Sequence, residues 1–155
     1  MILAGALLTG TSGCAFMAQQ ATLIHYDPSD GIGTTVGDVD VRNVIAIASD
    51  DGKAFSLLVT FINKSSKIVN VNLQYVSGTG KTAITKSVRS NDTASFGNAV
   101  GQPQIIILNP GIKPGALYPV YFQVGDAPGK ELLVPVLDAS LPQYKDLKPP
   151  EILRK

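Results

Sequence analysis

The sequence is poor in the side chains that metal sites and disulfide frameworks need. Its 155 residues include one Cys, one His, two Met and no Trp. A single Cys excludes a disulfide framework and any Cys-based zinc site. A single His excludes most metal sites that rely on several imidazoles. Much of enzyme and metalloprotein chemistry is therefore excluded by composition.

Charge is also scarce. Lys and Arg number 13 against 12 Asp and Glu, so charged residues make up 16% of the chain and the formal net charge is +1. Nucleic-acid binding needs a basic surface that such a chain lacks. Hydrophobic residues reach 45%, as in ordinary folded proteins, and the length suits one domain. We expect one folded domain that does not bind nucleic acid.

The N-terminal segment has the pattern of a bacterial lipoprotein leader. Residues 2–9 are apolar and uncharged, and Gly10-Thr11-Ser12-Gly13-Cys14 follows. The run is too short for a transmembrane helix, which needs about 20 apolar residues. Small residues before a lone Cys resemble the lipobox, in which a peptidase cuts beside small side chains and the thiol accepts a diacylglycerol. Thr11 departs from that pattern, since Leu usually stands there.

Cys14 is accordingly the predicted lipid-attachment residue. We expect a leader over residues 1–13, whose missing basic segment places its start upstream of this sequence. The lipidated Cys and a short tether then occupy residues 14–21 and anchor the protein on the extracytoplasmic face of the cell membrane. The alternative is a buried N-terminal strand or helix with an incidental Cys.

Residues 22–140 carry strand and turn signals and show no convincing helical period. The clearest strand places Val69, Val71, Leu73 and Tyr75 on one face and polar side chains on the other. The short strands are separated by Gly, Pro and Asp turns, which favours an all-β fold, an antiparallel sandwich or barrel of eight or nine strands. The predicted strands are residues 21–26, 37–48, 54–63, 67–76, 81–88, 103–108, 118–124 and 131–137.

Three details of these strands can be checked against a structure. The run Ile105–Leu108 is uninterrupted and apolar, which predicts a strand buried on both sides. Pro119 and Pro135 lie inside strand signals, and since proline cannot donate to a ladder, we expect both at edges or bulges. The sequence Ser49-Asp50-Asp51-Gly52 predicts a tight turn.

The C-terminal residues 141–155 are expected to form an extended tail, because three prolines interrupt them. The tail could wrap the domain, hang free or dock on a partner. Its apolar side chains make it the candidate partner-binding segment, through Tyr144, Leu147, Ile152 and Leu153.

Other candidate sites have simpler structural explanations. Gly78-Thr79-Gly80-Lys81-Thr82 lacks the first Gly of a phosphate-binding loop and precedes a strand, so we expect a hairpin turn and no nucleotide. Asp27 and Asp30 lie near a turn but are too few for a calcium loop. Asp50 and Asp51 are predicted turn residues. His25 has no second imidazole and no convincing nucleophile beside it, so no catalytic residue is predicted and the chain is not expected to be an enzyme.

One segment resembles a known family. The sequence from His25 to Val44 contains Tyr-Asp-Pro-Ser-Asp-Gly, Val-Gly-Asp-Val and Arg-Asn, and in this it resembles the LpqE-like lipoproteins of actinobacteria. The similarity covers roughly residues 22–140. The family is similar to periplasmic copper chaperones with a cupredoxin-like β-sandwich, and to accessory lipoproteins of the cytochrome bc1-aa3 respiratory supercomplex. The resemblance narrows the expected fold to an antiparallel β-sandwich of the immunoglobulin or cupredoxin-like type.

The resemblance leaves several functions open. The copper chaperones bind Cu(I) through two His and two Met, soft and borderline ligands that suit this ion, whereas His25 and Met17 are all that the predicted mature chain supplies. The favoured interpretation is a non-catalytic, lipid-anchored accessory subunit that binds respiratory complex III/IV subunits, without metal or other cofactor. The alternatives are a copper chaperone-like protein that assists oxidase metallation and, with less support, an envelope protein that binds glycan or lipid.

Overall fold

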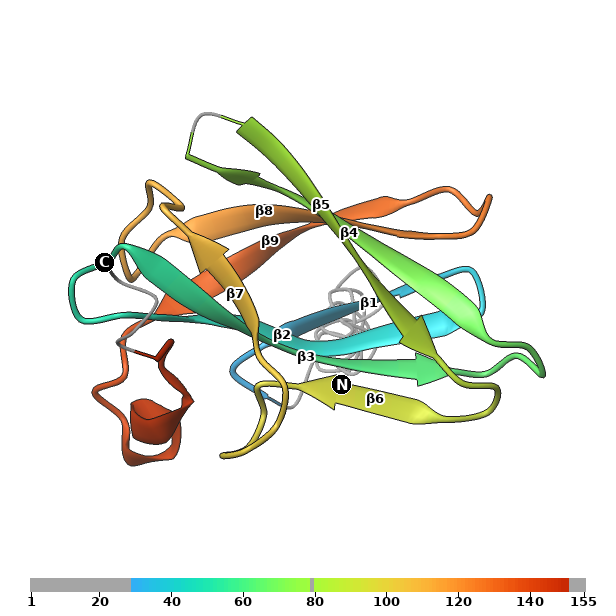
Figure 1. Cartoon of the computed structure of the whole chain (residues 1–155), viewed down its shortest axis with the longest axis horizontal. Helices are drawn as coiled ribbons and strands as arrows, with labels where there is room; N and C mark the ends of the chain where they lie inside the picture. The colour runs from blue at the N-terminus through green and yellow to red at the C-terminus, as the bar shows by residue number, and fades with distance from the viewer. Residues whose placement is uncertain (1–28, 79, 151–155) are drawn as a thin grey trace, which may run out of the picture.

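The computed structural model describes residues 29–78 and 80–150, and these residues form an almost purely β domain (Figure 1). The expected all-β fold is confirmed. The elements are β1 (Ile32–Val36), β2 (Val39–Ala48), β3 (Ala54–Asn63), β4 (Val69–Ser77), β5 (Gly80–Val88), β6 (Thr93–Phe96), β7 (Ile105–Leu108), β8 (Leu117–Val124), β9 (Lys130–Leu137) and the 3-10 helix η2 (Pro142–Leu147).

The strands form one curled sheet whose halves face each other. Its order is β5-β4-β8-β9-β2-β3-β6, with β1 paired to β2 and β7 to β3. We call the half made of β1, β2, β3, β6 and β7 sheet A and the half made of β4, β5, β8 and β9 sheet B. The halves join where β2 runs parallel to β9, at Ala46↔Val136 and Ile47↔Leu137. Every other strand pair in the described residues is antiparallel, so the antiparallel expectation holds with this one exception.

The core lies between the two sheets. Phe55 and Phe61 of β3 point inward from sheet A, and Tyr118 and Phe122 of β8 point inward from sheet B. The Phe55 and Tyr118 rings meet edge to face, with centroids 5.6 Å apart, and the Phe61 and Phe122 centroids lie 6.2 Å apart. All four side chains are fully buried, and each such burial contributes roughly 1.5–3 kcal/mol. These contacts hold the curled sheet closed as a sandwich.

Most predicted strands are found within about two residues of the expected ends. The expected strand over residues 21–26 lies outside the described residues. β1 and β6 were not predicted as separate strands. The prediction for β7 was wrong in one respect: Ile105 and Ile107 are buried, but Leu108 at its end is exposed. Only one face of β7 meets the core, against β3.

Both strand prolines lie where a ladder ends. Pro119 is beyond the last β4–β8 pair, Gln74↔Tyr121, and pairs only with β9. Pro135 comes immediately before the two pairs that join β9 to β2. Pro119 therefore costs no hydrogen bond to β4, and Pro135 costs none to β2, because neither proline belongs to the paired part of that ladder. This is the edge position expected for both.

The C-terminal residues differ from the expected extended tail. Residues 142–147 form η2, with Pro142 in its first turn, where a missing N–H is tolerated. Ile45 and Ile47 of β2 point away from the core, and Leu147 packs with them on the outer face of sheet A. We call residues 141–150 the strap, because they cover this apolar face. The tail is held against the domain because it carries the apolar surface that the face needs.

No helix in the described part of the chain is long and apolar enough to cross a membrane.

Candidate functional site

Several predicted site residues fall outside the described part of the chain. Cys14, the proposed lipid attachment residue, is one of them, as are His25 and the tail residues Ile152 and Leu153. The two other candidate tail residues, Tyr144 and Leu147, are described, and the structure gives each a partner within the domain.

Leu147 is buried, with 7% of its surface exposed, among Ile45, Ile47 and Leu58. The Tyr144 hydroxyl donates a hydrogen bond of 2.5 Å to an Asp30 carboxylate oxygen. Burial raises the pKa of Tyr144 to about 12, and the bond to Asp30 and its negative charge add to the rise. Both side chains are therefore used to attach the strap, and Leu147 is not available to a partner.

Polar contacts complete the attachment of the strap. Lys148 Nζ lies 2.9 and 3.0 Å from the two carboxylate oxygens of Asp50. The Gln104 amide donates to the carbonyls of Leu147 and Lys148, at 3.3 and 3.4 Å. The strap thus contacts two loops that lie far from it in sequence, so the described part of the tail wraps the domain, one of the three alternatives that the sequence left open.

The glycine-rich segment at residues 78–82 is a hairpin, as predicted. Ser77 of β4 pairs with Gly80 of β5, and Gly78 has a φ of +60°. Residues 80–88 continue as a strand. The expected turn is therefore confirmed, and the described residues after it form a strand in place of the helix that a phosphate-binding loop needs.

The acidic turn between β2 and β3 also has the predicted structure. The Ser49 hydroxyl donates to the Asp51 carboxylate at 2.6 Å, and the Lys53 amide donates to the same oxygen at 3.1 Å. Gly52 has a φ of +68°, which favours glycine. The side chains of this turn fix the backbone. Within the described residues, no three or more His, Cys, Asp or Glu side chains gather as a metal site would require.

The Val-Gly-Asp-Val motif, residues 36–39, forms the turn of the β1–β2 hairpin. Val36 pairs with Val39, and Gly37 between them has a φ of +55°. The following Arg42-Asn43 sits at a register shift in β2, where Asn43 has a φ of +50°. A Cβ on Gly31 would lie 2.7 Å from the carbonyl carbon of Asn43, so the backbones meet closely there. The motif residues described in the structure therefore shape the backbone.

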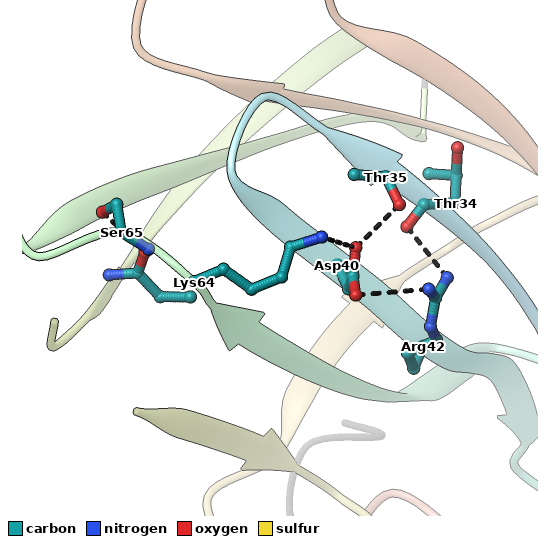
Figure 2. A network of polar contacts seen from close by, with 7 residues as sticks. Thr34, Thr35, Asp40, Arg42, Lys64 and Ser65 are labelled. Atoms are coloured by element: carbon teal, nitrogen blue, oxygen red, sulfur yellow. Dashed lines mark hydrogen bonds and ion pairs between the residues drawn. The ribbon is translucent and has the colours of Figure 1, made fainter. Parts of the chain in front are cut away.

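A polar network on the same hairpin centres on Asp40 (Figure 2). The Thr35 hydroxyl and the Lys64 ammonium donate to one carboxylate oxygen at 2.7 and 3.0 Å, and Arg42 lies 3.3 Å from the other oxygen. Burial alone would raise the pKa of Asp40, but the hydrogen bonds and the two cations outweigh it and lower the pKa below 3.8. Arg42 also donates to the Thr34 carbonyl at 3.4 Å. The network ties β1, β2 and the β3–β4 turn together and leaves the carboxylate fully engaged.

Sequence reasoning missed a groove on the outer face of sheet B. The groove encloses about 490 Å³. Opposed residues share a face of a sheet, and the pairs Gln74↔Tyr121 and Tyr121↔Glu131 place these three side chains in one row. The full lining is Gln74, Tyr75, Val76, Lys81, Pro119, Tyr121, Gln123 and Glu131. The sequence indicated one wall of the groove through the polar face of residues 67–76. It did not indicate which strands lie beside that face, because this depends on the pairing of the strands in the sheet.

The Tyr121 ring packs closely on Gly129 at the edge of this groove. A Cβ on Gly129 would lie 2.3 Å from Cζ and Oη of the Tyr121 ring. The ring therefore lies directly on the backbone of Gly129, diagonally across from its own pair partner on β9. Only glycine leaves room for the ring there.

Exposed apolar side chains extend along this face from one side of the groove. Leu117 is 54% exposed, Leu133 is 52% exposed and Val76 is 44% exposed. The pairs Pro119↔Leu133 and Leu117↔Pro135 place both leucines and both prolines on the same outer face. We call Val76, Leu117, Pro119, Leu133 and Pro135 the apolar strip. Within the described residues, nothing packs over it as the strap packs over sheet A.

Comparison with solved structures shows which fold this is. The copper-bound PCuAC domain from PmoF2 matches with a TM-score of 0.52 and 13% identity, covering 69% of this chain and 98% of that domain. The apo PmoF2 PCuAC domain matches with a TM-score of 0.55 and 11% identity, covering 71% and 98%. The apo PCuAC domain from PmoF1 gives 0.50 and 12%, covering 68% and 98%.

No protein-family model matches the chain, and no curated protein matches it by sequence. The similarity to the PCuAC domains is therefore one of structure at low identity, and it establishes the fold: this chain has the cupredoxin-like β fold of PCuAC domains, as expected from the sequence.

Proposed function

We propose that this protein is a non-catalytic accessory subunit, anchored by lipid on Cys14, that binds a membrane respiratory complex on the extracytoplasmic side. The observation that carries the proposal is the uncovered apolar strip on sheet B of a domain whose described residues contain no group of metal-ligating side chains. Exposed apolar surface of this kind is typical of protein interaction sites. The resemblance to LpqE-like lipoproteins favours the cytochrome bc1-aa3 supercomplex as the partner.

Co-purification tests this proposal directly. The full chain carries a C-terminal affinity tag in the bacterium that produces it, and membranes are solubilised in mild detergent. We expect subunits of the cytochrome bc1 complex and of the oxidase to elute with the chain in fixed proportion. Their absence, with an unrelated tagged lipoprotein as the control, would contradict the proposal.

The lipid anchor needs its own test. Cys14→Ser removes the thiol that would accept the diacylglycerol, so we expect the variant to leave the membrane fraction and to lose the mass of the lipid. Ser12→Ala is the matched control, because it keeps both the thiol and a small side chain near the cut. A Cys14→Ser protein that stays in the membrane with unchanged mass would refute the anchor.

The PCuAC fold favours copper delivery as a second candidate function. Among the sulfur and imidazole groups of the predicted mature chain, only Cys14, Met17 and His25 could serve a soft ion, and Cys14 is assigned to lipid. We therefore expect no stoichiometric binding when the full chain is titrated with Cu(I) against a competing chelator. Binding of one equivalent that is lost in His25→Ala would favour the chaperone.

A further inference from the structure

The two outer faces of the sandwich differ in one respect that points to an interaction surface. On sheet A, the apolar residues Ile45, Ile47 and Leu58 are covered by the strap. The Asp40 carboxylate, near the start of β2, is paired with Lys64 and Arg42. On sheet B, the apolar strip is exposed and no described segment packs over it. The chain thus covers one apolar face with its own C-terminus and leaves the other open.

The open face also carries charges that form no ion pair with another residue of the described ranges. Lys81 of β5 and Glu131 of β9 line opposite sides of the groove. The ion pairs found within the described residues join Asp40 to Arg42 and Lys64, and Lys148 to Asp50. Because β5 and β9 are separated by three strand spacings, their backbones lie about 14 Å apart. An occupant of the groove can therefore meet a positive charge on one side and a negative charge on the other.

The middle of the face offers hydrogen-bonding groups and one ring. Gln74 and Gln123 present side-chain amides, each of which donates and accepts. Tyr121 lies directly opposite Gln74 and two residues from Gln123 on β8, with its ring against Gly129. The face thus combines a polar groove that holds one aromatic ring with an apolar strip beside it, and protein-binding surfaces commonly combine aromatic, apolar and hydrogen-bonding groups in this way. A glycan site would use the ring and amides but leave the exposed leucines beside it unused.

We propose that the outer face of sheet B is the surface that docks this protein on its membrane partner, an inference that rests on the proposed function. The occupant is a protein segment that inserts an apolar side chain against Leu133 and Leu117. That segment carries an acidic group toward Lys81 and a basic group toward Glu131, and its backbone hydrogen-bonds to Gln74 and Gln123.

The size of the face indicates what kind of contact this is. It extends about 14 Å across the strands and about 20 Å along β8, from Leu117 to Gln123. Its outline is about 280 Å², well below the roughly 800 Å² that a standard interface buries on each partner, so the contact is of the weak, transient kind. A small contact of this kind gains from confinement of both partners in one membrane, which raises the effective concentration.

Site-specific photo-crosslinking in membranes tests the docking face. A photoreactive residue replaces Leu133 in the full chain, and Leu141 is the matched control, a leucine of similar exposure at the start of the strap. We expect position 133, and not position 141, to crosslink to a subunit of the respiratory complex. Crosslinking from 141 alone would show that the strap docks and would overturn the proposal. Crosslinking of position 133 only to glycan or lipid, or to a second copy of the chain, would also overturn it.

Charge reversal at the two sides of the groove provides an independent test of the docking face. Lys81→Glu and Glu131→Lys should each lower the crosslinking yield from position 133 about tenfold, the loss expected for a contact that matters to binding. Lys67→Glu, at an exposed turn, is the control and should leave the yield unchanged. Unchanged yields in both groove variants, with unchanged thermal unfolding, would refute the charge assignment that defines the occupant.

The two proposals fail in different ways. If the complex co-purifies with the wild-type chain but position 133 gives no crosslink to it, the docking face is wrong and the proposed function stands. If the complex does not co-purify and no position crosslinks to it, the proposed function fails and the docking proposal fails with it.

Discussion

Tyr144 and Asp30 are 114 residues apart in the sequence and share a 2.5 Å hydrogen bond. The bond joins the strap to the segment before β1, so the C-terminal end of the described chain is attached near its N-terminal end. Tyr144→Phe removes the donor and keeps the ring. Because the bond is exposed, we expect a loss of only about 0.5 kcal/mol in the free energy of unfolding at neutral pH, measured by urea denaturation.

The alkaline pH dependence of the same variant gives a sharper test. The pKa of Tyr144 is raised from 10 to about 12 in the folded protein. A raised pKa gives a stabilisation that is complete below pH 10 and is lost as the pH rises toward 12. The difference in unfolding free energy between wild type and Tyr144→Phe should therefore shrink over this range. A constant difference would show that neither burial nor Asp30 raises the pKa of the Tyr144 hydroxyl in the folded protein. Tyr118 is present in both proteins, so its titration cancels in the comparison.

Leu147→Ala tests whether the strap is part of the folded domain. Leu147 is buried against Ile45, Ile47 and Leu58, so truncation leaves apolar surface uncovered. We expect a loss of about 2 kcal/mol, at the low end for a buried leucine because the site is at the surface. Leu141→Ala, which removes an exposed leucine from the same segment, should cost less than about 0.5 kcal/mol. Equal effects would mean that the strap does not pack as described.

The strap shows why part of this fold could not be predicted from the sequence. Proline at 142, 149 and 150 indicated a tail without regular structure, yet the outward-facing residues Ile45 and Ile47 needed a cover. Their uninterrupted apolar run in β2 is explained by burial on both faces, which a local pattern cannot assign to a distant segment. The clean alternation at Val69–Tyr75, in contrast, was sufficient to predict β4, because one face of this strand is buried in the core and the other faces solvent.

The sequence did not predict β1 or β6, and the physical reason differs between the two strands. β1 contains Gly33 and two threonines, so it has little apolar alternation, and its Gly33 is needed where a Cβ would lie 2.9 Å from the Val41 carbonyl oxygen. β6 has four residues, too few for a period of two to be recognised. The groove on sheet B depends on the register between β4, β8 and β9, which is a tertiary property and has no local signal.

Asp40→Asn tests the polar network of the β1–β2 hairpin. The variant keeps the shape of the side chain but loses its charge beside Lys64 and Arg42, whose side chains are 54% and 37% exposed. We expect a loss of about 1 kcal/mol at pH 7, because pairs this exposed are weak individually and the carboxylate also loses charge-assisted hydrogen bonds.

Acid pH should remove the difference between Asp40→Asn and wild type. The pKa of Asp40 is lowered below 3.8, so its stabilisation is present above pH 3.8 and is lost as the pH falls through the lowered value. Denaturation series from pH 7 down to pH 2 should show the two curves converging. Asp38→Asn is the control at an exposed turn position, and it should follow wild type across the series. Curves that remain parallel would show that the charge of Asp40 is not the source of its stabilising effect.

Gly129→Ala tests whether Tyr121 is held in the groove by the glycine beneath it. An added methyl would lie 2.3 Å from the ring, so either the ring moves or the β8–β9 loop shifts. Overpacking of this kind costs about 1–3 kcal/mol. The cost should disappear in a Tyr121→Ala background, since removal of the ring leaves room for the methyl, and a double-mutant cycle measures this coupling.

Gly80→Ala is the control for backbone effects, because a methyl added there would have no neighbour within 4 Å and the φ of Gly80 is not positive. It should change the stability by less than about 1 kcal/mol. If Gly129→Ala costs the same with and without the Tyr121 ring, its effect comes from the loop backbone, and the ring is not supported by the glycine. If the cycle shows coupling, Tyr121 is a preformed part of the sheet B face, so that a partner docking there meets a rigid ring and does not lose free energy in ordering it.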